Sequence, residues 1–138
     1  MSEIIRFGVS LDKRLLNRFD RLIRKRSYTN RSEALRDLIR QEMVKNEWEE
    51  DQEVAGAITY IYDHHKRDLL SKLTNIQHTH HEIIFSTQHI HLDHNTCLEI
   101  VAVRGKAREV QELAYALRSI KGVRHGTLSM TSTGKAIE

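Results

Sequence analysis

The chain has 138 residues, of which 39% are hydrophobic and 30% charged, so it fits one ordinary domain or two small ones and not a disordered polymer. No apolar run reaches membrane-spanning length and the N-terminus lacks the apolar core of a signal peptide, so we expect no membrane partner. A single cysteine excludes a disulfide framework, which favours a reducing, cytoplasmic location.

The formal net charge of +3 conceals two oppositely charged parts. Residues 1–46 carry twelve Lys/Arg against six Asp/Glu, a net of +6, whereas residues 47–138 are net −3 and hold all nine histidines. A basic, histidine-free part joined to an acidic, histidine-rich part indicates two functions on one chain, with nucleic-acid binding as a candidate for the first. A solvated basic face without a partner is the alternative that charge alone leaves open.

The first 45 residues predict one strand and two helices. Residues 4–10 alternate with the period of a strand that has one buried face, with Ile5, Phe7 and Val9 on one side and Arg6, Gly8 and Ser10 on the other. An amphipathic helix follows, opening near Asp12, which is a good N-cap. A second helix opens near Asn30, which is spaced from Glu33 as in a capping box.

So small a unit cannot close a core alone, and its single strand has no neighbour within the chain. Two chains that pair their strands into an antiparallel ribbon solve both problems, and such a ribbon fits the DNA major groove. Arg6, Gly8 and Ser10 then face the bases, and the helix start near Asn30 can face a phosphate. The alternative is that these three are merely exposed residues of a dimerisation domain. The element order and the run at residues 30–37 (NRSEALRD) resemble the ribbon-helix-helix fold.

The rest of the chain predicts a second, α+β domain. After an acidic stretch at residues 47–53, we expect strand 54–62, helix 66–77, strand 82–92, strand 96–104, helix 106–119 and strand 123–130. The order βαββαβ is the ferredoxin-like arrangement, with helices on one face of an antiparallel sheet. The predicted organisation is therefore a DNA-binding and dimerisation domain at 1–48, a linker at 49–53 and a ferredoxin-like domain at 54–138.

Candidate metal ligands gather between residues 77 and 99. On a strand, His89 and His91 project from one face, and Ile90 and Leu92 turn the other way, which we expect to be toward the core. A turn after Leu92 can return Cys97 beside the two histidines, so two imidazoles and a thiolate can converge. Because a thiolate must be deprotonated to bind, a metal ion would favour that form.

The fourth ligand and the metal stay open at this point. His78, His80 or His81, after the first helix of this domain, could complete the site. Zinc prefers tetrahedral sites, whereas nickel(II) and copper(II) favour square-planar N/S sites. The other histidines are expected to be mostly solvated, with weak binding of excess metal: His64, His65, His80, His81 and His94.

With these motifs, nearly the whole chain resembles the nickel-responsive transcriptional regulators. The shared residues are the NRSEA helix start, Gln77–His78, His89-x-His91, Cys97–Leu98–Glu99 and the run GVRHG at 122–126. The resemblance implies one square-planar nickel(II) per chain, held by His89, His91 and Cys97 of one chain and His78 of a neighbouring chain. It also implies a homotetramer that represses nickel-related genes by binding double-stranded operator DNA when the metal is abundant.

Further roles follow from the same resemblance. Lys66 and Arg67 would reach the DNA backbone, although they also fit an ordinary exposed helix start. Glu33 and Asp37 match positions that bind a second cation in some relatives, although a capping box and a surface carboxylate explain them as well. Gln77 and Glu99 are expected to orient the ligands by hydrogen bonds. Gly8 departs from the family, since a larger polar residue often contacts bases at this position.

Three other functions compete with this interpretation. A zinc-dependent hydrolase would use Glu99 as its base, but nothing suggests a substrate pocket and an enzyme has no need of a basic ribbon. A ribbon-helix-helix regulator could sense another metal or a small molecule, and in the second case a change at Cys97 would leave sensing intact. A metal storage or transport protein would bind metal tightly without any effect on DNA.

Overall fold

The structure is a computed structural model that describes residues 3–138. It divides into two compact units, the first ending at Gln41 and the second comprising Glu42–Glu138. The first contains helix α1 (Lys13–Lys25) and the first half of helix α2 (Arg31–Glu49). The second contains the end of α2 and the remaining six elements.

Both helices of the first unit begin where the sequence predicts. Asp12 caps α1, since its side chain accepts hydrogen bonds from the backbone N–H groups of Arg14 and Leu15. Asn30 Oδ1 accepts from the Glu33 backbone N–H at 2.9 Å, while the Glu33 carboxylate accepts from the Thr29 hydroxyl. The half of the capping box made by the Asn30 side chain therefore forms. The Glu33 carboxylate bonds to the Thr29 hydroxyl in place of the Asn30 backbone N–H.

Residues 3–12 form no strand in the single chain, and their apolar side chains lie open to solvent. Ile5 is 76% exposed and Phe7 is 73% exposed. Within the described part of this unit, only Ile23 and Ala34 are buried. A strand needs a hydrogen-bonded neighbour, and the described residues of this chain supply none for this segment. The exposed apolar side chains agree with that expectation of a ribbon-helix-helix fold.

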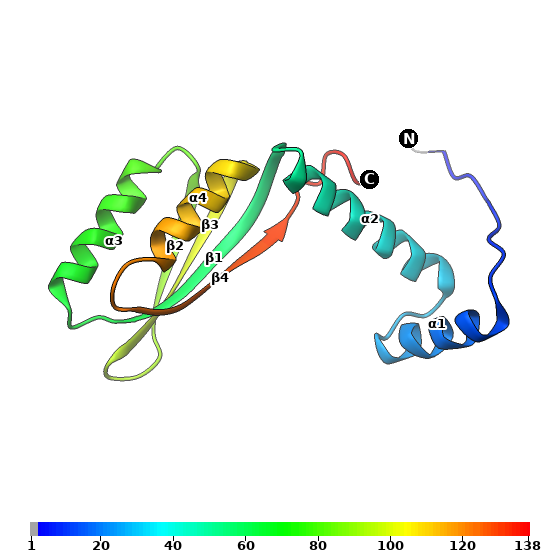
Figure 1. The fold of residues 1–138 in the computed structure, drawn as a ribbon, viewed down its shortest axis with the longest axis horizontal. Helices are drawn as coiled ribbons and strands as arrows, with labels where there is room; N and C mark the ends of the chain where they lie inside the picture. The colour runs from blue at the N-terminus through cyan, green and yellow to red at the C-terminus, as the bar shows by residue number, and fades with distance from the viewer. Residues whose placement is uncertain (1–2) are drawn as a thin grey trace. The chain divides into compact units, whose positions relative to one another are not determined.

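The second unit is a four-stranded antiparallel sheet with two helices, in the predicted order βαββαβ. Its elements are β1 (Glu53–Asp63), α3 (Arg67–Thr79), β2 (Ile84–His91), β3 (Thr96–Lys106), α4 (Ala107–Arg118) and β4 (Val123–Thr131). The strands are ordered β2-β3-β1-β4, and α3 and α4 cover one face of the sheet (Figure 1). The fold class is therefore α+β, as predicted.

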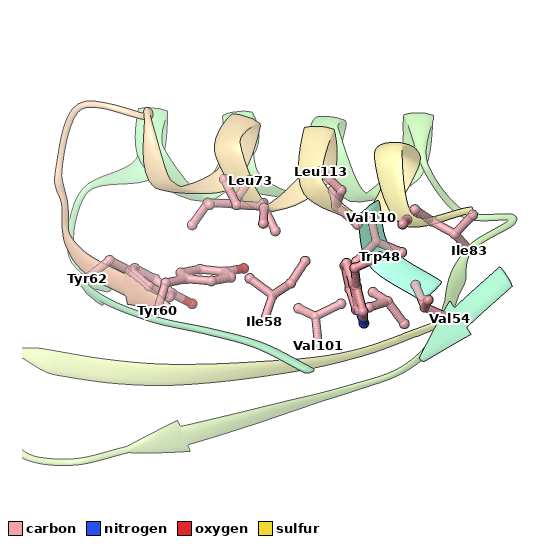
Figure 2. Close-up of a cluster of buried hydrophobic side chains, with 14 of the residues drawn as sticks. Trp48, Val54, Ile58, Tyr60, Tyr62, Leu73, Ile83, Val101, Val110 and Leu113 are labelled. Atoms are coloured by element: carbon pink, nitrogen blue, oxygen red, sulfur yellow. The ribbon is translucent and has the colours of Figure 1, made fainter. Parts of the chain in front are cut away.

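The core lies between this face and the two helices (Figure 2). Val54, Ile58, Tyr60 and Tyr62 project from β1 toward the helices. On β3 the buried residues are Cys97, Glu99, Val101 and Val103, which occupy alternate positions. The helix side of the sheet therefore contains both the apolar core and the positions that face the candidate ligands.

This arrangement corrects one prediction about β2. Ile90 and Leu92 do not enter the core: Ile90 is half-buried and Leu92 is 54% exposed. His89 and His91 pair in register with the buried Glu99 and Cys97, so the two histidines share the helix side of the sheet. The alternation was predicted, but which face the helices cover depends on the chain's crossovers, which alternation does not encode.

The end of α2 is packed into the second unit. The helix continues to Glu49, into the acidic stretch where a linker is expected, and Trp48 is buried with its Nε1–H donating to the Thr131 carbonyl at 2.8 Å. Beyond it, Asp51 accepts from the Arg108 backbone N–H and thereby caps α4. The indole ring and the cap fix the polypeptide that enters β1.

Candidate metal centre

Two of the predicted ligands lie in contact where β2 and β3 face each other. His91 pairs in register with Cys97, and the Cys97 Sγ lies 3.3 Å from the His91 Nδ1. Asp93 stabilises the connecting turn, since its carboxylate accepts from the backbone N–H groups of Asn95 and Thr96 at 2.8 Å. The turn expected from the sequence thus returns the thiol beside the imidazole.

His64 is a third member of this cluster. It follows β1 in the turn before α3, and His64, His91 and Cys97 each offer a ligand atom within 4.8 Å of the others. The rings of His64 and His91 are 5.0 Å apart and nearly perpendicular. The buried Nδ1 of His64 has no hydrogen-bond partner among residues 3–138. From the sequence, His64 is expected among the mostly solvated histidines, whereas the structure places it beside two candidate ligands.

His89 lies next to this group, with its ring 5.1 Å from that of His91. Its Nδ1 is 3.1 Å from the hydroxyl of Tyr62, and that hydroxyl donates to Glu99 at 3.3 Å. Because one hydroxyl proton cannot serve both partners, the Nδ1 of His89 is the donor to Tyr62. In the neutral imidazole with this tautomer, the Nε2 of His89 keeps its lone pair, which is the form that binds a metal.

The hydrogen bonds continue from Glu99 to helix α3. The side-chain amide of Gln77 donates to the Glu99 carboxylate and to the Tyr60 hydroxyl, both at 2.8 Å. Burial, reinforced by the Glu99 charge, raises the pKa values of Tyr60 and Tyr62 far above the ordinary tyrosine value, so both remain donors. The sequence predicts that Gln77 and Glu99 orient the ligands, but it does not predict the role of the two tyrosines. A tyrosine in a β-strand is ordinarily expected to be a core residue.

The fourth predicted ligand, His78, sits in the last turn of α3 and is exposed. Its ring stacks on that of His81 at 5.9 Å, and His81 Nδ1 contacts the His78 carbonyl oxygen. His80 contacts the Ile76 carbonyl in the same way. His78 is not one of the three clustered residues, and its role as a ligand for a neighbouring chain stays a prediction.

The thiol of Cys97 and the half-buried imidazole of His64 are both shifted toward their neutral forms. Burial is the main cause that raises the pKa of Cys97, and the nearby carboxylates of Glu99, Asp63 and Asp93 add to it. Burial also lowers the pKa of His64, followed by its neighbours His65 and His91. A neutral imidazole is ready to bind a metal, whereas the thiol has to lose its proton on binding.

The remaining candidate residues lie outside this centre. Arg6, Gly8 and Ser10 are exposed in the extended segment before α1, and Lys66 and Arg67 are exposed at the start of α3. Asp37 accepts from the Tyr28 hydroxyl at 2.6 Å, and Glu33 accepts from Thr29. Both carboxylates of the candidate second cation site therefore have local partners, and their role as cation ligands stays a prediction.

Comparison with known proteins identifies the two parts separately. Residues 5–45 match the family described as "Ribbon-helix-helix protein, copG family", and residues 55–131 match the "NikR C terminal nickel binding domain". A protein of Syntrophus aciditrophicus is 67% identical over 98% of both chains, and one of Geobacter sulfurreducens is 54% identical over 99% of both. Both carry the name "Putative nickel-responsive regulator". The solved structure of an uncharacterized protein of Thermotoga maritima aligns with 57% of this chain and with 98% of the Thermotoga chain. The TM-score is 0.52 and the sequence identity 14%, which shows a shared fold.

A ribbon-helix-helix part joined to a nickel-binding part defines a class of transcriptional regulators, not of enzymes. The chain belongs to the nickel-responsive regulator family. No helix within residues 3–138 is long and apolar enough to cross a membrane.

The hydroxyl of Tyr62 can be tested as the group that positions His89. In Tyr62→Phe we expect nickel affinity to fall roughly 10–100-fold, as for other hydrogen-bond partners of metal ligands, with the aromatic packing kept. Competition with a chelator of known affinity measures the change. Tyr60→Phe is the matched control, because the Tyr60 hydroxyl contacts Gln77 and no candidate ligand. Equal losses in the two variants would contradict a positioning role for Tyr62.

Proposed function

We propose that this protein is a repressor whose affinity for operator DNA increases when nickel(II) is bound. The four ligands are His89, His91 and Cys97 of one chain and His78 of a neighbouring chain, with one metal per chain. The observation that carries the proposal is the contact of Cys97 with His91 beside a His89 whose Nε2 is left free by Tyr62. An N/S donor set of this kind suits square-planar nickel(II).

The chain's own residues supply the coupling between the metal and DNA. A site completed by His78 of another chain favours one quaternary arrangement, here a tetramer made of two ribbon-helix-helix dimers. Gln77 precedes His78 in α3 and donates to Glu99, so α3 is tied to the same hydrogen-bond network that orients His89. Lys66 and Arg67 at the other end of α3 are then placed to contact the DNA backbone.

Base contacts would come from the ribbon. Arg6 can contact a guanine edge in bidentate fashion and Ser10 can bond to several bases, while Gly8 adds no side chain. Glu33 and Asp37 would bind a second cation only at the expense of their present contacts with Thr29 and Tyr28. Synthesis and action in the cytoplasm fit a free thiol among the ligands.

The test is a binding measurement with DNA that the protein itself selects. Nickel-loaded protein is used to enrich duplexes from a random pool, and the affinity for the enriched duplex is then measured with and without nickel at one fixed salt concentration. We expect nickel to tighten binding by roughly 5–150-fold, the usual range of allosteric coupling.

His78→Ala is the informative variant, since the side chain is exposed at the end of α3 and the fold does not depend on it. It should lose the nickel-dependent gain in DNA affinity and keep the basal affinity. A nickel-independent wild type, or a His78→Ala variant that responds fully to nickel, would overturn the proposal.

A further inference from the structure

We propose that one face of helix α1 is an additional DNA-binding surface, which contacts the phosphate backbone beside the bases that the ribbon contacts. This surface, the α1 stripe, consists of Arg14, Arg18, Arg21 and Lys25. The inference rests on the proposed function, because it presumes the same duplex and the same paired ribbon. The occupant of the stripe is the sugar-phosphate backbone of that duplex, which carries no sequence information of its own.

The four side chains form one narrow row along the helix. They are spaced by four, three and four residues, so they fall within an arc of about 60° around the helix axis. From Arg14 to Lys25 the row is about 16 Å long. All four side chains are exposed, whereas Leu16, Phe19 and Ile23, on another side of α1, are half-buried or buried. The stripe is therefore directed to solvent and is free to meet a partner.

The positive charge of the stripe is not matched by negative charge. None of its four residues forms an ion pair with a carboxylate within residues 3–138. Asp20 is the only acidic residue of α1, and both of its carboxylate oxygens accept from Arg31 at 2.9 Å. On α2, in contrast, Arg40 and Lys45 each pair with a carboxylate of their own helix. A row of one sign is complementary to a polyanion, whereas a mixed face is not.

Both ends of α1 adjoin segments that the proposed function assigns to DNA. Only two residues separate Ser10, on the base-facing side of the ribbon segment, from Lys13 at the start of α1. At the other end, the two hydrogen bonds between Arg31 and Asp20 tie α1 to the first residue of α2, whose start is expected to face a phosphate. Helix α1 thus runs from the ribbon segment to the start of α2 within one compact unit (Figure 1).

The chemistry of the row favours phosphate. Three of its four residues are arginines, and a planar guanidinium can donate two parallel hydrogen bonds to one phosphate group. One DNA strand rises about 3.4 Å per nucleotide, so a row of about 16 Å extends along about five nucleotides. Contacts of this kind add affinity for every sequence alike. We therefore expect the stripe to strengthen binding to any duplex and to leave the preference for the selected duplex unchanged.

The experiment measures the affinity of full-length, nickel-loaded protein for the selected duplex and for a scrambled duplex of the same length, over a series of salt concentrations. Each phosphate contact contributes about 0.9 to the steepness of log affinity against log salt, which is about fivefold in affinity near 0.15 M salt. Arg18→Gln removes one contact from each of the two chains of a ribbon. The dependence on salt should then become shallower by about 1.8, and affinity should fall roughly 30-fold for both duplexes.

Arg24→Gln is the matched control, because it removes the same charge from the same helix about 120° away from Arg18, outside the stripe. It should leave the salt dependence close to that of the wild type. Arg18→Lys keeps the positive charge and should retain most of the salt dependence, which separates loss of charge from damage to the helix.

The inference is overturned if Arg18→Gln and Arg24→Gln show the same salt dependence, which is also the result expected if the stripe binds an acidic protein surface and not DNA. Failure of the proposed function would look different. Nickel would then leave the affinity of the wild type unchanged for both duplexes, whereas the difference in salt dependence between Arg18→Gln and Arg24→Gln would remain.

Discussion

Replacing Cys97 with alanine is expected to abolish square-planar nickel binding and, with it, any nickel-dependent gain in operator affinity. Binding free energies of structural zinc sites are about 10–16 kcal/mol, or roughly 3 kcal/mol for each of four ligands, so loss of one ligand costs at least about 100-fold. The loss of affinity should be at the upper end of that effect, because Cys97 is the only cysteine in the sequence and no other thiolate can replace it. Wild-type protein should show a thiolate-to-metal charge-transfer band that saturates at one nickel per chain.

The pH dependence gives this prediction a second readout. Burial raises the pKa of the Cys97 thiol, so at neutral pH the metal-free side chain is protonated and nickel must displace the proton. Nickel affinity should therefore rise as pH rises, by about tenfold per pH unit from this group, and level off once pH exceeds the thiol pKa. The Cys97→Ala variant should lose this contribution to the pH dependence of nickel affinity.

His125→Ala serves as the control for this variant, because His125 lies exposed on β4 outside the cluster. It should retain the charge-transfer band and its pH dependence. Weak, octahedral nickel binding that neither Cys97→Ala nor His78→Ala affects would show that the metal binds elsewhere. The protein would then be a ribbon-helix-helix regulator with a different signal.

The sequence predicts the order of the elements well because each one has a local cause. Asp12 and Asn30 carry side-chain oxygens that cap helices, and both do so in the structure. The strand expected at residues 96–104 corresponds to β3 (Thr96–Lys106), which is rich in apolar residues. The turn at Asp93 depends on a carboxylate that bonds to backbone two and three residues ahead, which is also a local interaction.

The parts that the sequence does not predict depend on contacts between distant residues. His89 and His91 lie on the side of the sheet on which the helices pack, and alternation alone does not distinguish that side from the other. His64 and Cys97 lie 33 positions apart in the sequence and meet only because β1 and β3 pair in register. A repeated histidine next to a turn was the available signal for His64, but the same pattern is common on solvated loops.

The tyrosines show the same limit in a different way. Tyr60 and Tyr62 occupy core positions, and the sequence alone gives no reason to separate them from Ile58. Only the three-dimensional arrangement shows their hydroxyls gathered around Glu99, with one directed to His89 and one to Gln77. A buried carboxylate with three donors nearby makes these core residues part of the candidate metal centre.

Phe7→Asp is expected to abolish operator binding while leaving metal binding intact. Phe7 is 73% exposed in the single chain and, with Ile5 and Val9, forms the apolar side of the segment that pairs with a second chain. Pairing would bury two unpaired carboxylates, and an uncompensated buried charge costs about 3–5 kcal/mol, so the loss of DNA affinity should exceed roughly 100-fold. Gel-shift titration with the selected duplex measures it.

Ile4→Asp is the matched control, since it introduces the same charge three residues before Phe7, on the side of Arg6 and Gly8. It should leave pairing of the ribbon intact, as judged by the helical circular dichroism and thermal unfolding of the first unit, even if the added charge weakens contact with phosphates. Nickel binding should be unchanged in both variants, because the second unit contains its own buried core. Retention of operator affinity by Phe7→Asp would mean that DNA is bound without a paired ribbon, and the basic face of the helices would then have to carry the contacts.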